Sequence, residues 1–115
     1  MPRAIRIHEN GGPEVLRLET VDYEPLGARQ VRIRQAAIGV NFIDTYDRSG
    51  LYPVTLPSGI GREAAGVVLE IGKAVKTLRV DERVAYAGTS PGAYCDERVM
   101  DAARVVKLPD SVSDH

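Results

Sequence analysis

The sequence has little of several features that define particular classes of protein. Its 115 residues include one cysteine, which excludes an internal disulfide and fits a reducing compartment. No apolar stretch approaches the roughly 20 residues of a membrane span, and residues 1–6 lack the apolar core of a signal peptide. These absences predict a soluble, cytoplasmic protein with no membrane partner.

An excess of charge of one sign is also absent. Fifteen basic residues stand against sixteen acidic ones, for a net charge of −1, and the basic residues are scattered along the chain. Without a basic patch we expect no nucleic-acid partner. A hydrophobic content of 43% and this length are sufficient for one domain with a modest core.

Alternation of apolar and polar residues predicts several short strands. The clearest covers residues 31–38, where Val31 and Ile33 alternate with two arginines. Other strands are expected in residues 4–9, near 14–21, and in 64–71, 82–87, 93–100 and 104–108, with residues 73–81 as a polar connection. Six to eight strands separated by regular turn signals predict an all-β barrel or sandwich.

One helix is expected between these strands. Asn41 can cap it, and Asp44 three residues later favours its first turn. The helix would cover about residues 42–48, and Gly50 suits its C-terminal end. The following segment, 51–60, contains prolines and glycine and is expected to be a loop.

The stretch 59–72 organises the rest of the chain. Arg62 and Glu63 come directly before the apolar run 64–71, which places two charged side chains at the edge of a pocket or in an ordinary surface pair. The run has the length of a strand, and Gly66 inside it predicts a bulge or a tight packing contact.

Residues 61–68 resemble a known family signature. They read Gly-Arg-Glu-Ala-Ala-Gly-Val-Val, which is similar to the G-H-E-x-x-G-x-V motif of medium-chain dehydrogenases/reductases. Further segments in the same order resemble the quinone oxidoreductase (zeta-crystallin-like) branch of that superfamily, and they are residues 8–16, 41–46, 49–53, 83–86 and 92–94. Asp81-Glu82 departs from the family's Gly-Asp. The resemblance covers residues 4 to 112.

This resemblance implies a mainly β, GroES-like distorted barrel with one or two short helices. It would span residues 1–115 as the N-terminal catalytic and substrate-binding domain. In intact members a Rossmann-type nucleotide-binding domain follows, the active site is the cleft between the two domains, and the nucleotide-binding domain commonly forms a homodimer. The sequence has no G-x-G-x-x-G motif. We therefore expect an excised domain or a truncated gene product that folds, is inactive alone, binds dinucleotide weakly at best, and could be monomeric.

Zinc is not expected, although many relatives in the superfamily use it. Their catalytic metal takes Cys, His and Cys ligands. Asn41 stands at the first cysteine position, and Arg62 replaces the histidine of G-H-E; a guanidinium cannot ligate zinc. His8 on a strand edge and the terminal His115 do not supply a substitute, and the four-cysteine structural site is absent.

The resemblance implies hydride transfer from NADPH to a quinone. By motif match, Asn41, Tyr46 and Tyr52 are the expected catalytic residues, and Asn41, Asp44 and Tyr46 would lie beside the nicotinamide. Each has a simpler interpretation: Asn41 as a helix cap, Tyr46 as a partly buried structural aromatic and Tyr52 as loop packing. NADPH rather than NADH is an implication of the resemblance alone.

Two other side chains deserve a prediction. Arg62 could pair with Asp44 and bias the pocket towards an anionic hydroquinone, or form an ordinary salt bridge with Glu63 or Asp44. Cys95 matches no ligand or nucleophile position and is expected to be a small buried side chain.

Two alternative functions stay open. One is another zinc-free reductase, acting on an enoyl or alkenal substrate, although residues 41–46 and 49–53 favour the quinone branch. The other is a stand-alone GroES-like binding module without enzyme activity.

Overall fold

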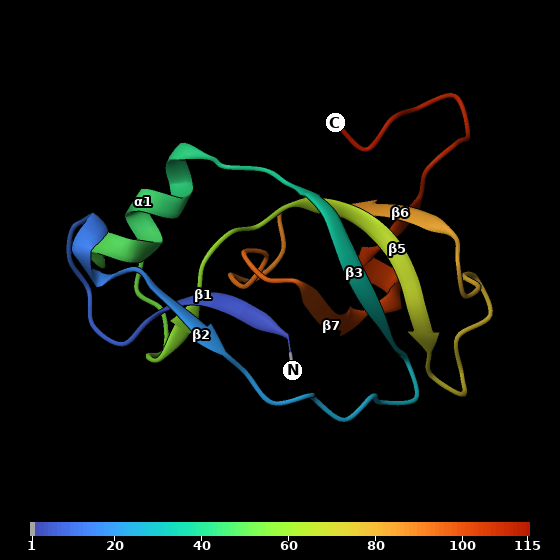
Figure 1. Cartoon of the computed structure of the whole chain (residues 1–115), viewed down its shortest axis with the longest axis horizontal. Helices are drawn as coiled ribbons and strands as arrows, with labels where there is room; N and C mark the ends of the chain where they lie inside the picture. Colours follow the sequence, from blue (N-terminus) through green and yellow to red (C-terminus); the bar gives the residue numbers. More distant parts are fainter. Residues whose placement is uncertain (1) are drawn as a thin grey trace.

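Strands dominate the computed structural model, which describes residues 2–115 (Figure 1). Their order along the chain is β1 (Arg3–Ile7), the 3-10 helix η1 (Pro13–Val15), β2 (Arg17–Thr20), β3 (Gln30–Ile38), α1 (Phe42–Ser49), β4 (Ser58–Gly59), β5 (Ala64–Ile71), β6 (Arg83–Tyr86), β7 (Glu97–Asp101), the 3-10 helix η2 (Ala102–Arg104) and β8 (Val106–Lys107). The predicted bounds of α1, β3 and β5 hold to within one residue.

The larger sheet has the strand order β7-β3-β5-β6-β8, and every neighbouring pair is antiparallel. Val31 and Ile33 on β3 are fully buried, as the alternation predicts. Gly66 on β5 pairs with Gln35, beside a register shift in β3, and a Cβ at Gly66 would lie 2.2 Å from the carbonyl oxygen of Arg34. The predicted tight contact at Gly66 is therefore confirmed.

The smaller sheet has the order β2-β1-β4 and packs around Ile7, Val15 and Ile60. One isolated bridge, between Ala4 and Cys95, links it to the strand region before β7. The mainly β GroES-like prediction is confirmed, but within residues 2–115 the two sheets do not close into a barrel. The two sheets stay open because β4 has only two residues and because the smaller sheet pairs with the segment before β7 only through the bridge between Ala4 and Cys95.

Several segments differ from their predictions. The expected loop 51–60 ends in the short strand β4, and parts of the strands expected near 14–21 and over 104–108 form the 3-10 helices η1 and η2. The connection 73–81 is not simply polar, because Val75 and Leu78 are buried in the core of the larger sheet. The strand expected over 93–100 begins only at Glu97. The residues before it bond elsewhere, since the backbone N–H groups of Ala93 and Tyr94 donate to carbonyl groups of residues 61 and 60.

The single α-helix of the described residues, α1, has eight residues. It projects at one end of the molecule, above the smaller sheet, while the C-terminal tail lies over the larger sheet (Figure 1). Throughout residues 2–115, no helix combines the length and apolar character that crossing a membrane requires.

Candidate functional site

Helix α1 buries two aspartates and carries its aromatic residues on the other side, where Phe42 is exposed and Tyr46 half-buried. Asp44 and Asp47 are 4% and 0% exposed, whereas Phe42 is 75% exposed. Residues three apart share a helix face, so Asn41 at the N-cap lies in line with the two aspartates. Phe42 and Tyr46, four residues apart, share another face and contact each other. This inverts the usual arrangement of a surface helix, in which the apolar face is the buried one.

Three polar contacts at Asn41, Asp44 and Asp47 hold α1 against the rest of the domain, and we call them its anchors. The first two are made by hydrogen bonds. The Asn41 amide donates from Nδ2 to Oε2 of Glu63 at 2.9 Å. The Tyr94 hydroxyl donates to Oδ2 of Asp44 at 2.6 Å, and the backbone N–H of Asn41 donates to the same oxygen at 3.0 Å. The other oxygen of Asp44, Oδ1, is buried and has no hydrogen-bond partner among the described residues. Burial, with help from the Asp44 carboxylate, raises the pKa of Tyr94, which keeps its hydroxyl a donor.

The third anchor is a two-pronged ion pair. Arg62 donates from Nη2 to Oδ1 and from Nε to Oδ2 of Asp47, both at 2.9 Å. Its remaining Nη1 donates to the carbonyl oxygen of Thr89 at 3.3 Å. The hydrogen bonds to Asp47 raise the pKa of Arg62 and outweigh the lowering by burial. A planar guanidinium held at three points in this way is fixed in both position and charge.

The predicted partners of Arg62 were therefore wrong. It pairs with Asp47 rather than with Asp44 or Glu63. Asp44 is occupied by Tyr94 and by the start of the helix, and Glu63 turns back towards Asn41. Asp47 was missed because it belongs to none of the family motifs. The signal that could have found it is its three-residue spacing from Asp44 on a helix that was itself predicted.

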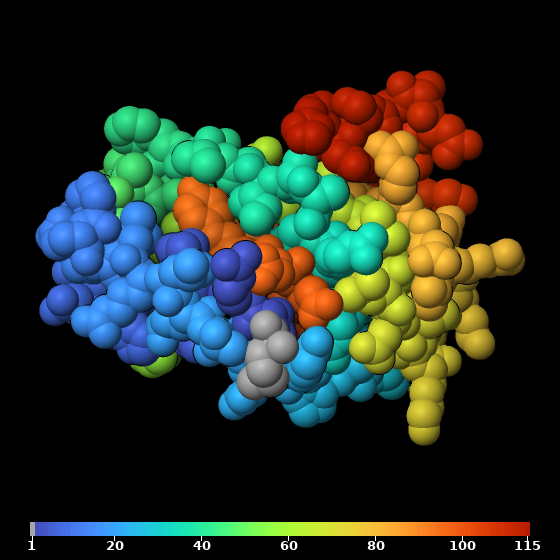
Figure 2. All heavy atoms as spheres, in the orientation of Figure 1, coloured from blue at the N-terminus to red at the C-terminus, as the bar shows by residue number. Residues whose placement is uncertain are grey.

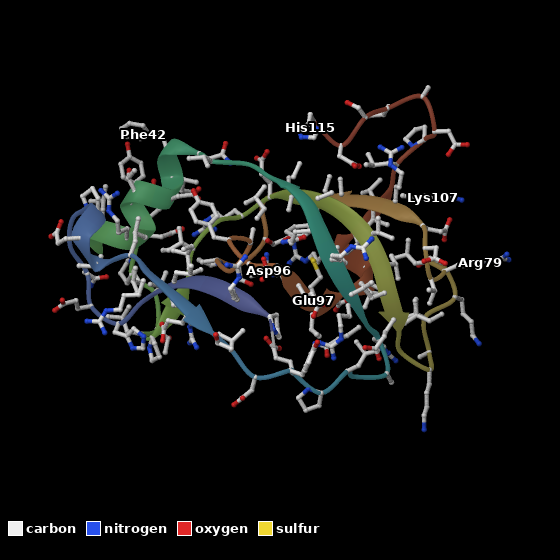
Figure 3. All side chains as sticks on the ribbon, in the orientation of Figure 1. Phe42, Arg79, Asp96, Glu97, Lys107 and His115 are labelled. Atoms are coloured by element: carbon white, nitrogen blue, oxygen red, sulfur yellow. The ribbon has the colours of Figure 1, made fainter. Side chains whose placement is uncertain are left out.

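The exposed side of α1 continues into an aromatic cluster. Tyr46 lies edge-to-face between Phe42 and Tyr52, with ring centroids 5.4 and 5.3 Å apart. Tyr52 is 47% exposed and comes from the loop after α1. The structure thus brings the predicted residues Tyr46 and Tyr52 together, close in sequence to Asn41. Figure 3 shows Phe42, which was not predicted, on the outer side of α1 and directed away from both sheets.

A cavity of about 550 Å³ lies beside Glu63. It is lined by small apolar residues of β3, β5 and β6 and by two tail residues, namely Ala37, Ile38, Ala64, Ala65, Ala85, Asp114 and His115. Figure 2 shows the tail (red) beside β3 (teal) on the face that also carries α1 (green). A second cavity of about 530 Å³ is lined by charged residues of both signs and by none of the predicted site residues.

The remaining candidate ligands lie apart from α1. His8 contacts Glu19 on the smaller sheet at 2.6 Å. Cys95 is half-buried, less than predicted, and its thiol donates to the carbonyl oxygen of Gly92 at 3.3 Å. Burial raises the pKa of Cys95 to about 11, so a reactive thiolate is not favoured. Across residues 2–115, no three His, Cys, Asp or Glu side chains come close enough together to hold a metal ion.

Comparison with known proteins places this geometry in a family. Residues 27–110 match the profile of the alcohol dehydrogenase GroES-like domain. The quinone oxidoreductase of Pseudomonas aeruginosa is 50% identical over 115 residues, which are 97% of this chain and 35% of that protein. The chain therefore spans about a third of the length of the curated relatives it matches.

Solved structures show the same relation. The quinone oxidoreductase of Pseudomonas syringae pv. tomato superposes with a TM-score of 0.96 at 49% identity, covering 99% of this chain and 35% of the other. The Escherichia coli quinone oxidoreductase complexed with NADPH has a TM-score of 0.94 at 42% identity, with the same coverage. This chain belongs to the alcohol dehydrogenase GroES-like domain family, in the quinone oxidoreductase branch that its motifs predict.

Proposed function

We propose that this chain is the substrate-binding and catalytic domain of an NADPH-dependent quinone oxidoreductase that works without zinc. The observation that carries the proposal is the inverted helix α1, whose aspartates are bonded inward while the half-buried Tyr46 lies between the exposed rings of Phe42 and Tyr52. Exposed aromatic rings beside an amide suit flat partners that carry carbonyl groups, and both a quinone and a nicotinamide fit that description.

The residues present fit one end of NADPH. The rings of Tyr46 and Tyr52 can contact the nicotinamide, and the second amide hydrogen of Asn41 remains to donate to a carbonyl group. Asp44 is buried on the inner side of α1, and it would serve this end of NADPH by holding Asn41, whose backbone N–H donates to its carboxylate. For the pyrophosphate, the sequence offers no glycine-rich turn opening a helix. We infer that a Rossmann-type domain outside residues 1–115 binds that end.

The chain's own residues would bind and orient the acceptor. NADPH, when bound, supplies the hydride. Tyr46 and Tyr52 would cover the acceptor ring and exclude water, and a tyrosine hydroxyl or the Asn41 amide would donate to the acceptor oxygen as negative charge develops on it. The apolar cavity beside Glu63 offers space for the body of the acceptor.

Zinc independence rests on the chemistry of the donor set. Arg62 stands where zinc-dependent relatives carry histidine, and its guanidinium is held by both oxygens of Asp47. A permanent cation in that place repels a metal ion and offers no lone pair. Stoichiometric zinc in purified, active protein, measured by elemental analysis, would overturn this part of the proposal.

Location and assembly belong to the same proposal. The single cysteine and the absence of a basic patch support a cytoplasmic enzyme with no nucleic-acid partner. We expect the intact enzyme to be a homodimer formed through the nucleotide-binding domain and the 115-residue chain to be a monomer. Light scattering of both proteins would check this.

The decisive test is activity in a two-domain protein. The chain is fused to the remainder of the Pseudomonas syringae quinone oxidoreductase, whose matching part is 49% identical. We expect quinone-dependent oxidation of NADPH by the fusion and none by the chain alone. Replacing Tyr52 with Phe or Asn41 with Ala should lower kcat/KM for the quinone.

The acceptor panel separates the alternatives. Faster turnover of enoyl or alkenal substrates than of quinones would favour the second reductase class. A folded fusion that binds NADPH but reduces no acceptor would refute the enzyme proposal and favour a binding module.

A further inference from the structure

Helix α1 depends on directional polar contacts for its orientation. It has eight residues, too few to be stable alone, and its buried residues are aspartates rather than apolar side chains. Apolar packing tolerates sliding, whereas a bidentate guanidinium–carboxylate pair fixes both distance and rotation. The rotation of α1 about its axis, and with it the position of Tyr46, is therefore set at the aspartates.

The partners of these aspartates come from a rigid platform. Arg62 and Tyr94 lie on two segments that are hydrogen-bonded to each other. The backbone N–H groups of Gly92 and Ala93 donate to the carbonyl oxygen of Gly61 at 2.9 and 3.0 Å, and that of Tyr94 donates to residue 60 at 2.8 Å. Gly61 has φ +96° and lies so close to the Tyr94 ring that a Cβ there would be 2.3 Å from Cδ1. These hydrogen bonds and this close contact couple the two segments, which together are called the platform.

We propose that Asp47 and Tyr94 are positioning residues for acceptor reduction, acting through α1 to hold Tyr46 and Asn41 in place. Neither side chain needs to touch substrate or cofactor. Asp47 is fully buried, and the Tyr94 hydroxyl is taken up by Asp44. This inference rests on the proposed function for its catalytic meaning, but the positional claim concerns only the chain itself.

The chain offers a unique probe of that position. Phe42 is its single phenylalanine, and it contacts Tyr46 edge-to-face at 5.4 Å. A ring-fluorinated phenylalanine therefore gives one ¹⁹F resonance, which reports on the aromatic side of α1. An edge-to-face neighbour makes the shift of that resonance sensitive to small changes in ring geometry.

The test compares variants that change the anchors with one that only lowers stability. Asp47→Asn and Tyr94→Phe remove one anchor each at nearly constant volume. Arg32→Gln removes a buried guanidinium at the opposite end of β3, where it bonds to Glu70, and serves as the control. Each spectrum is recorded at the same interval below the melting temperature of that variant. We expect both anchor variants to shift the ¹⁹F resonance and the control to leave it in place.

Kinetics in the fused two-domain protein give the functional readout. Displacing a reacting group by about 1 Å can cost on the order of 100-fold in rate. We expect Asp47→Asn and Tyr94→Phe to lower kcat/KM for the quinone by roughly 10–100-fold, while KM for NADPH stays unchanged because most dinucleotide contacts lie in the other domain. The control should keep both constants.

A further variant separates position from stability. Replacing the whole ion pair, in Arg62→Met/Asp47→Val, should restore the melting temperature but leave the ¹⁹F resonance displaced and kcat/KM low. An unshifted resonance in folded Asp47→Asn and Tyr94→Phe, or kinetics that follow the melting temperature across all variants, would overturn the inference. If the unmodified fusion reduced no quinone, the proposed function would fail, and the resonance alone would still decide the positional claim.

Discussion

Replacing Arg62 with methionine should strongly destabilise the chain, because it leaves a carboxylate buried without its counter-charge. Asp47 is 0% exposed and takes both of its hydrogen bonds from Arg62. Removing one partner of a buried ion pair typically costs about 3–5 kcal/mol. Since the Arg62 side chain is 25% exposed, water screens part of the pair, and we expect the lower end, about 3 kcal/mol.

The double variant Arg62→Met/Asp47→Val should recover most of this loss. It buries no charge, so we expect stability within about 1 kcal/mol of the parent and a coupling energy of about 3 kcal/mol between the two sites. A chain of this length has a free energy of unfolding of roughly 6–17 kcal/mol, so every variant remains folded and measurable.

Urea unfolding followed by circular dichroism measures these differences. With a slope of about 1–3 kcal/mol per molar, a loss of 3 kcal/mol lowers the midpoint by roughly 1–3 M at an unchanged slope. Arg83→Met is the matched control, because Arg83 pairs with Asp114 nearer the surface and its loss should cost at most about 1 kcal/mol. If Arg62→Met cost no more than that control, or if the two single losses simply added in the double variant, the account of this pair as a buried anchor would be refuted.

Further predictions concern three other positions in the chain. Gly66→Ala should cost about 3 kcal/mol or more, because its Cβ would lie 2.2 Å from the carbonyl oxygen of Arg34; normal soluble expression with an unchanged melting temperature would contradict this. Asp81→Gly should raise the free energy of unfolding by about 0.5 kcal/mol, because Asp81 has φ +75° where the family has glycine. The backbone strain that glycine relieves is larger than the extra chain entropy that glycine loses on folding. A lower free energy of unfolding in denaturant would count against this prediction. Burial raises the pKa of Cys95 to about 11, so iodoacetamide should alkylate it at neutral pH about 100-fold more slowly than in the unfolded chain. Because this folded pKa lies above the unfolded value, stability should be lost as the pH rises from about 9 to 11, and a Cys95→Ala variant should lack that loss.

Local features of the sequence determined the elements that carry the site. The alternation in residues 31–38 predicts β3, the apolar run 64–71 predicts β5, and an N-cap residue with a glycine beyond the last turn predicts α1. Each of these signals depends on neighbours within a few positions, so the sequence is sufficient to read them. The ordered motifs likewise predict the GroES-like family, which the comparison confirms.

Features that depend on pairing between segments far apart in the sequence were predicted less well. The segment 73–81 looks polar, but Val75 and Leu78 enter the core because β5 and β6 on either side are paired and bring the connection back over the sheet. Residues 93–96 have strand composition, yet the backbone N–H groups of Ala93 and Tyr94 donate to the carbonyl groups of residues 61 and 60, and that of Asp96 donates to Arg3 on β1. Whether the expected distorted barrel closes also depends on which strands meet, and in the described residues the two sheets stay open.

The sequence by itself determined which residue types gather near α1, and the tertiary structure decided what each of them does. Asn41, Tyr46 and Tyr52 could be named from motifs, but their roles in cofactor and acceptor binding stay predictions. That Arg62 binds Asp47, fifteen positions away in the chain, follows from the direction in which α1 faces the platform of residues 60–63 and 92–94. Directional bonds between segments far apart in sequence leave no local pattern, so only the folded chain reveals that this helix is anchored by its charges and turns its aromatic residues away from the buried aspartates.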